Sequence, residues 1–197
     1  MKKIFLLVFV VGLVYAYVQD RQANNAVEYI TPKNTPERAA EEIIRDVWGT
    51  RSHRAGDEAV RRVREIRSIK QADGTFALDM RIHIEGATEH GVLTGLLDHA
   101  KKLFPKLVAD ERLNAYNEFR LYGSLPMSDG RGNVSEDYIS KVFFTRKAVQ
   151  EVAWEKTDTP DLHFVLSKKN DGKGCTYWVH GVILSKITWL KSYTPNI

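Results

Sequence analysis

Residues 75–85, with the sequence TFALDMRIHIE, alternate between two kinds of side chain. Large apolar residues occupy every second position from Phe76 to Ile84, and the positions between them are polar except for Ala77. Successive side chains of a strand point to opposite faces, so this pattern predicts a strand with one buried face and one solvated face. One-sided burial of this kind is typical of antiparallel sheets.

A hairpin turn is predicted directly before this strand. Asp73 and Gly74 form a pair that adopts the positive φ values of tight turns, so residues 63–71 are predicted to be the partner strand. Apolar residues in the same region also recur at intervals of three, which leaves a helical start open. They are Val60, Val63, Ile66 and Ile69.

Two helices are predicted to flank this hairpin. The first begins where Thr35 can cap it and Pro36 suits its first position, and it ends at Gly49. The second follows Gly86 and carries an apolar stripe at helical spacing. We expect it to end before Pro105, because the residue before a proline disfavours the helical conformation.

The carboxy-terminal half predicts more strands and one short helix. Strands are expected at 115–123 and 139–145, a helix capped by Thr145 follows, and residues 162–184 read as a hairpin with Asp-Gly in its turn. The fold class is therefore α+β, with a mainly antiparallel sheet built from hairpins and two or three helices packed on one face. We expect residues 37–197 to form a single domain of this class.

The amino terminus predicts export. A basic start, MKK, precedes fifteen uncharged residues at 4–18, a run shorter than the ~20 apolar residues that span a membrane. It suits a signal peptide cleaved after residues 14–16, and an uncleaved membrane anchor stays open as the alternative. We therefore expect a signal peptide or anchor over 1–18 and a polar linker over 19–36. The remainder would lie in the periplasm or on the extracytoplasmic face of the inner membrane.

The positive charge of the chain is concentrated in one segment. The chain carries a net charge of +4, and residues 51–70 alone hold six arginines and one lysine against three acids. This segment predicts a site for an anionic partner, although the interleaved acids also suit an ordinary solvated face. The arginines are Arg51, Arg54, Arg61, Arg62, Arg64 and Arg67.

The segment SDGRGNVSED at 128–137 is a candidate cation loop. Its possible ligands are Asp129, Asn133 and Asp137. Val134 and Ser140 stand where a helix–loop–helix calcium site requires glycine and glutamate, so only a weak cation site is predicted. Asp-Gly pairs also occur at 73–74 and 171–172 between predicted strands, which favours a turn here as well. No metal centre or cofactor is predicted.

Few residues suggest catalysis. Cys175 is the single cysteine, Ser124 lacks the Gly-x-Ser-x-Gly setting of a nucleophile elbow, and His163 is a distant partner for the thiol. The six histidines include no pair at the i, i+4 spacing of a helical zinc site. The tryptophans are expected to pack in the core or at edges rather than form a sugar-stacking platform. They are Trp48, Trp154, Trp178 and Trp189.

The stretch YGSLPMSDGRGNVSEDYISKVFFTRKAVQEVAW, at 122–154, carries one resemblance. It combines an aliphatic-Pro step, a polar Asp-x-x-Gly-Asn turn, a strand with Val and Phe, and a short helix ending in Trp154. The order resembles an uncharacterised family of small exported or membrane-attached bacterial domains, over roughly residues 75–155 and most strongly over 121–154. The shared motifs are structural, so the resemblance implies no activity.

We therefore expect an exported bacterial envelope protein that acts as a non-catalytic binding or interaction domain. Its partner would be an envelope protein or an anionic surface, and nucleic acid is not expected. The membrane would be contacted through residues 4–18 if that segment is not cleaved. The alternative is an envelope-acting hydrolase that uses Cys175 or the acidic loop at 129–137.

Overall fold

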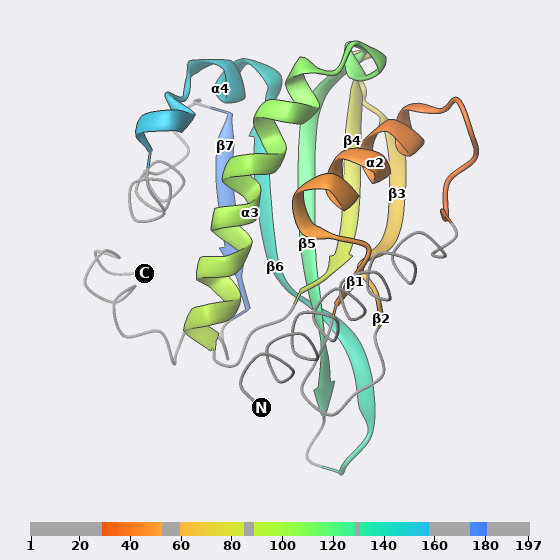
Figure 1. The fold of residues 1–197 in the computed structure, drawn as a ribbon, viewed down its shortest axis with the longest axis vertical. Helices are drawn as coiled ribbons and strands as arrows, with labels where there is room; N and C mark the ends of the chain where they lie inside the picture. The colour runs from red at the N-terminus through yellow and green to blue at the C-terminus, as the bar shows by residue number, and fades with distance from the viewer. Residues whose placement is uncertain (1–28, 53–59, 85–88, 129–130, 158–173, 181–197) are drawn as a thin grey trace, which may run out of the picture.

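The computed structural model describes residues 29–52, 60–84, 89–128, 131–157 and 174–180 (Figure 1). The helices are α2 (Pro36–Trp48), α3 (Glu89–Ala109) and α4 (Arg146–Glu151), with single 3-10 turns at Glu111–Leu113 and Trp154–Lys156. The strands are β1 (Arg51–Ser52), β2 (Val60–Arg61), β3 (Val63–Lys70), β4 (Phe76–His83), β5 (Tyr116–Ser128), β6 (Val134–Thr145) and β7 (Cys175–Val179). The predicted export segment and the first arm of the last hairpin lie outside the described residues.

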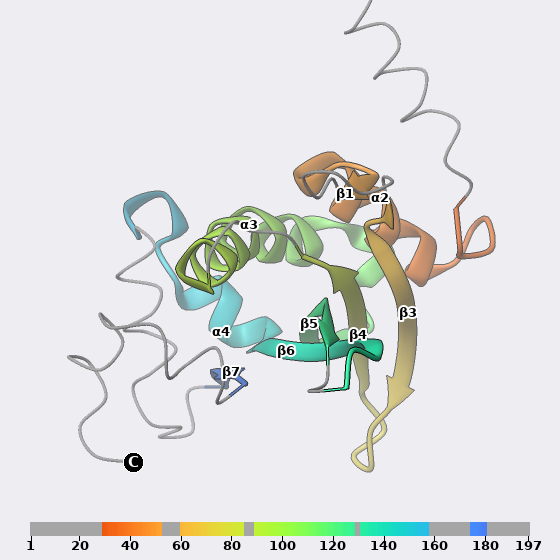
Figure 2. The ribbon, with the colours of Figure 1, turned by 90° about the horizontal axis from the view of Figure 1, so that it is seen from below.

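The five long strands form one sheet in the order β3-β4-β5-β6-β7, and β1 pairs with β2 beside it. Three of the four pairings in the large sheet are antiparallel, which confirms the predicted α+β class. The exception is β4 with β5, which run parallel because α3 crosses over between them. Figure 2 shows α2 and α3 together on one side of the sheet.

Local signals set the bounds of α2 and α4 as predicted. The Thr35 hydroxyl accepts a hydrogen bond from the Arg38 amide at 3.2 Å, and Thr145 caps Ala148 in the same way. Gly49 ends α2 with a φ of 82°, a conformation that a residue with a Cβ rarely adopts.

The prediction that the second helix ends before Pro105 is wrong, because α3 continues to Ala109. A proline inside a helix removes one backbone hydrogen bond. Here the turn that contains it is held by packing, since Leu103, Phe104 and Leu107 are all completely buried. Full burial of one such side chain contributes about 1.5–3 kcal/mol, which offsets the local loss.

The core lies between the helices and the sheet. The predicted inward positions of β4, Leu78, Met80 and Ile82, are completely buried, as are Phe119 and Leu121 of β5. Aromatic rings link the helix layer to β6, because Phe104 of α3 packs on Phe144 and Phe144 packs on Trp154. One face of the sheet is thus fully used for packing.

Arg146 fixes the end of the crossover. From the first turn of α4 its guanidinium donates to the carbonyls of Val108, Leu113 and Tyr116, at 2.9, 2.5 and 2.8 Å. These carbonyls belong to the connection that leads from α3 into β5. Burial lowers the pKa of this arginine, and the three acceptors satisfy its donors without a carboxylate.

Residues 29–35, the last part of the predicted linker, lie against α2. The buried carboxylate of Glu41 accepts hydrogen bonds from the amides of Ile30 and Thr31 and, at 2.6 Å, from the Thr31 hydroxyl. The chain that leads from the amino terminus is therefore attached to the helix at a defined point.

Removal of this attachment should loosen the amino-terminal approach. Glu41→Ala leaves buried donors without their acceptor, so we expect the free energy of unfolding to fall by about 2–3 kcal/mol. The adjacent Glu42→Ala is the matched control, because Glu42 pairs with Arg38 and Arg112 at the surface and its loss should cost less than about 1 kcal/mol. Urea unfolding measures both values. Equal losses in the two variants would contradict the attachment.

Candidate binding face

Figure 2 shows that one face of the sheet points away from α2 and α3. Strand register assigns three cross-strand rows of residues to that face. Strand register places directly opposed residues on the same face, and strands lie about 4.8 Å apart, so a five-strand row spans about 19 Å. The first row is Arg67, Asp79, Arg120, Phe143 and Thr176; the second is Glu65, Arg81, Tyr122, Lys141 and Trp178; the third is His83, Ser124 and Tyr138. We call these thirteen residues the open face.

The arginines of the open face are paired with carboxylates on the same face. Glu65 binds Arg81 at 2.8 Å and also contacts Arg67. Arg120 pairs with Glu118, its neighbour but one along β5, at 2.6 Å and reaches Asp79 at 3.5 Å. The thirteen residues hold four cations, Arg67, Arg81, Arg120 and Lys141, against the carboxylates of Glu65 and Asp79, and with Glu118 beside them the net charge is +1.

Two aromatic side chains stand out from this charged surface. Trp178 and Tyr138 are 49% and 40% exposed, and they are the exposed large apolar side chains of the described chain. Tyr138 meets the ring of Tyr122 edge-on, with centroids 5.8 Å apart, and the guanidinium of Arg81 lies over it at 4.9 Å. The ammonium of Lys141 lies over the ring of Tyr122 at 5.3 Å. Apolar ring surface and cations therefore alternate across the face.

Glu136 joins four strands at the edge of the third row. Its carboxylate accepts a hydrogen bond from Arg64 Nε at 2.9 Å and one from the Ser124 hydroxyl at 2.5 Å, and Arg64 Nη2 forms an ion pair with its second oxygen at 2.9 Å. His83 Nδ1 lies 3.4 Å from the same carboxylate. Burial acts to raise the pKa of Glu136, but the Ser124 hydrogen bond and the charge of Arg64 outweigh it, so the pKa lies below its ordinary value.

This cluster does not have the geometry of a catalytic triad. In a triad the histidine takes the proton of the serine hydroxyl, whereas His83 and Ser124 both contact the carboxylate of Glu136. Ser124 is also buried, and its hydroxyl lies 3.1 Å from the Ile82 carbonyl. The arrangement holds strands together and leaves no activated nucleophile at the surface.

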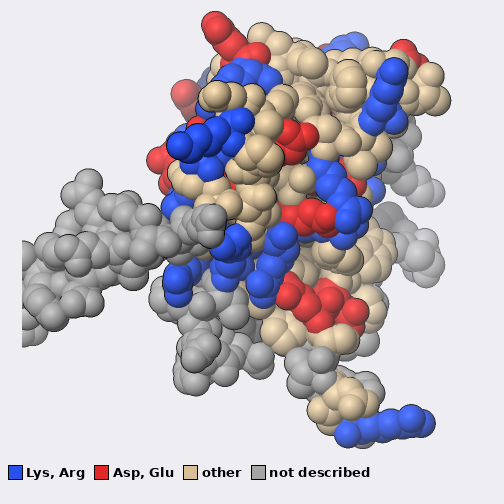
Figure 3. Space-filling model, turned by 90° about the vertical axis from the view of Figure 1, so that its right-hand side faces the viewer, with Lys and Arg blue, Asp and Glu red and all other residues tan. Residues whose placement is uncertain are grey.

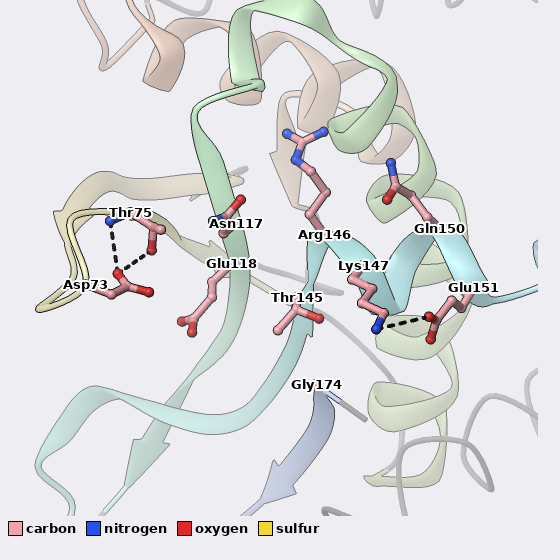
Figure 4. A pocket seen from close by; sticks show the side chains of 10 residues that line it. All are labelled: Asp73, Thr75, Asn117, Glu118, Thr145, Arg146, Lys147, Gln150, Glu151 and Gly174. Carbon is pink, nitrogen blue, oxygen red and sulfur yellow. Dashed lines mark hydrogen bonds and ion pairs between the residues drawn. The ribbon is translucent and has the colours of Figure 1, made fainter. Parts of the chain in front are cut away.

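A hollow of about 730 Å³ continues the open face beyond its first row (Figure 4). It is lined by Asp73, Thr75, Asn117, Glu118, Thr145, Arg146, Lys147, Gln150, Glu151 and Gly174. Glu118 belongs to β5 next to the first row, so the hollow and the face are continuous. Figure 4 shows the Arg146 guanidinium pointing away from the other lining side chains and Lys147 paired with Glu151, at 3.8 Å. The lining is therefore rich in hydroxyls, amides and carboxylates.

The predicted arginine cluster is not gathered into one surface. Arg62 is buried and donates to the carbonyls of His83 and Arg51, while Arg64 and Arg67 pair with Glu136 and Glu65. Arg51 and Arg61 are half-buried opposite each other in the β1–β2 pair, and Arg54 lies outside the described residues. Figure 3 shows basic and acidic side chains interspersed on the side of the molecule that carries β3.

The candidate cation loop joins two paired strands. The pairing of β5 and β6 extends to Ser128 opposite Val134, so the segment between them closes a hairpin, and Gly132 has a φ of 85°. Of the three predicted ligands, Asp129 lies outside the described residues, Asn133 is exposed, and Asp137 accepts a hydrogen bond from Ser135 at 3.0 Å. Among the residues that the structure describes, no three metal-binding side chains converge.

Cys175 is buried opposite Phe144, on the side of the sheet that the helices cover. Its thiol is thus part of the core, and His163 lies outside the described residues. Trp178, expected to pack in the core or at an edge, lies on β7, the last strand of the described sheet, and is exposed on the opposite face. The alternation in CTYWV signals this, because Thr176 and Trp178 share one parity while Cys175, Tyr177 and Val179 share the other.

Comparison with known proteins adds no relative. No family model, no curated protein and no solved structure matches the chain. The resemblance of residues 121–154 to small exported bacterial domains therefore stays a prediction. In the described residues, no helix has the length and apolarity needed to cross a membrane.

Acid should destabilise the fold before carboxylates are protonated. Burial lowers the pKa of His83 and of His99, so the unfolded chain binds protons near pH 6.5 more readily than the folded chain does. The free energy of unfolding should therefore be highest above about pH 7 and fall as the pH drops through 6.5. The fall amounts to about 1.4 kcal/mol for each unit by which folding lowers a histidine pKa. Loss of the Glu136 interactions follows below about pH 4.5.

Urea unfolding from about pH 7.5 to pH 5 measures this dependence. His83→Asn keeps a hydrogen-bond donor near Glu136 but does not titrate, so its decline should be smaller than that of the unaltered chain. The same decline in both proteins would show that His83 does not contribute.

Proposed function

We propose that the chain is an exported domain of the bacterial envelope that binds its partner through the open face and catalyses no reaction. One observation carries the proposal: the exposed large aromatic side chains of the described chain, Trp178 and Tyr138, are both on that face. Tryptophan and tyrosine dominate the energetics of binding surfaces, because they offer large contact areas with little rotamer entropy.

The rigidity of the face supports this role. Residues of β4, β5 and β6 belong to strands that pair on both sides, and those of β3 and β7 belong to strands that pair on one side. Ion pairs also hold the arginines in place. A preorganised surface loses little conformational entropy when it binds. By contrast, the candidate nucleophiles Ser124 and Cys175 are both buried.

The amino-terminal sequence supports export. The apolar run ends at Val18, and the chain is attached to α2 from Ile30 onward, so about ten residues connect the two. Fully extended, ten residues reach about 35 Å. If residues 4–18 remain in the membrane, the open face would operate close to the membrane surface. Attraction of the exposed arginines to an anionic surface is a separate proposal, and it requires binding that weakens with salt.

Export can be tested with a reporter phosphatase that is active only outside the cytoplasm, fused behind residue 197 in a bacterial host. We expect activity from the full chain and none after deletion of residues 4–18. An inactive full-chain fusion that is expressed at the same level would contradict export.

The binding face can be tested by a photo-crosslinking amino acid placed at position 178 in cells. We expect adducts from position 178 and none from position 102, because Lys102 is exposed on α3, on the opposite side of the sheet. Equal adducts from both positions, or none from 178, would contradict the proposed face.

A further inference from the structure

We infer that the partner of the open face is an uncharged glycan, a β-1,4-linked chain of N-acetylated amino sugars. This inference rests on the proposed function, since it names the ligand of the same face. It follows from three properties of that face: the spacing of its exposed aromatic residues along the strands, the pairing of its arginines with carboxylates, and the polar hollow at its end.

The two exposed rings are spaced for a chain of sugars. Trp178 is opposite Lys141 on the neighbouring strand, and Tyr138 lies three residues from Lys141 along β6. A strand spacing of about 4.8 Å and a rise of about 3.3 Å per residue put the Cα atoms of Trp178 and Tyr138 about 11 Å apart, which is comparable with the length of two linked pyranose rings. Pyranose rings have an apolar face of C–H groups that packs on aromatic rings, while their hydroxyls remain free for hydrogen bonds.

The pairing of the arginines favours an uncharged chain over a polyanion. Arg67, Arg81 and Arg120 each already pair with a carboxylate, and among the four Lys and Arg side chains of the described rows only Lys141 makes no ion pair. Binding to nucleic acid or to anionic lipid depends on several cations that neutralise phosphates. A polyanion would meet Glu65, whereas sugar hydroxyls can accept from guanidinium groups and donate to carboxylates.

The aromatic residues do not form the core of a protein interface. Such cores are contiguous, depleted of charge and fully desolvated at their centre. Here Lys141 lies between the two exposed rings, and Arg81 covers part of Tyr138. Two exposed rings that are separated by a cation and lie among paired charges suit a ligand that alternates apolar faces with hydroxyls.

The hollow offers the bound glycan a second subsite. Its volume of about 730 Å³ is in the usual range for small-molecule sites. Glu118 connects it to the first row, and Thr75, Thr145, Asn117 and Gln150 supply neutral hydrogen-bonding groups. These groups suit a sugar with its hydroxyls and acetamido group, and the first row, which includes Phe143, lies between the exposed rings and the hollow.

The direct test uses a hexamer of β-1,4-linked N-acetylglucosamine as the probe and the purified full chain in detergent. NMR titration follows the indole N–H signal of Trp178, which Trp178→Phe identifies by its absence. We expect this signal to shift on titration. Trp178→Ala and Tyr138→Ala should each weaken binding about tenfold, because each removes one stacking contact. Trp178→Phe should retain part of the affinity.

Lys102→Ala is the control, since it changes an exposed residue on α3 and should leave the affinity unchanged. Affinity should also stay constant between about 50 and 500 mM salt, because no net charge is neutralised. Co-sedimentation with purified cell-wall sacculi should rank the variants in the same order of affinity.

Failure of the hexamer and the sacculi to bind would overturn the glycan assignment, and adducts from position 178 would then leave the proposed binding face intact. Binding only to vesicles that contain phosphatidylglycerol, with loss at high salt, would overturn it in favour of an anionic surface. Glycan binding that Trp178→Ala and Tyr138→Ala do not weaken would overturn the assignment to this face.

Discussion

The structure depends on the one-sided covering of its sheet. The helix layer buries Leu78, Met80 and Ile82 of β4, so the residues between them face away from the helices. Every strand that joins β4 in register must then place alternate residues on that same second face. The two-residue alternation of a single strand thus determines which residues of the five strands form that surface.

Charge pairing is the consequence of that constraint. Arginines and carboxylates that stand opposite each other neutralise one another, as Arg81 and Glu65 do, and Glu136 gathers partners from three other strands. Charged side chains and the irregular register near Val63 also protect the β3 edge from pairing with another sheet. These features keep a broad flat surface soluble while two aromatic rings remain exposed on it.

Local features of the fold could be predicted from the sequence, and distant ones could not. Thr35, Gly49 and Thr145 act on residues within one helical turn, so their roles follow from position alone. The direction of β5 relative to β4 depends instead on a crossover that contains the 21-residue helix α3, and the passage of α3 through Pro105 depends on packing against strands far away in sequence. Short-range patterns contain neither kind of information.

The open face illustrates the same limit for a functional surface. Its second row draws residues 65, 81, 122, 141 and 178 into one line, and only strand order and register bring them together. Sequence patterns single out Arg62 and Arg64 because they lie within one basic segment. In the structure, Arg62 is buried and donates to backbone carbonyls, and Arg64 forms an ion pair with Glu136. Clustering along the chain is therefore weak evidence for a site in this fold. The parity of Trp178 in CTYWV is stronger evidence, because a large aromatic residue on the solvated side of a strand gains little from the core.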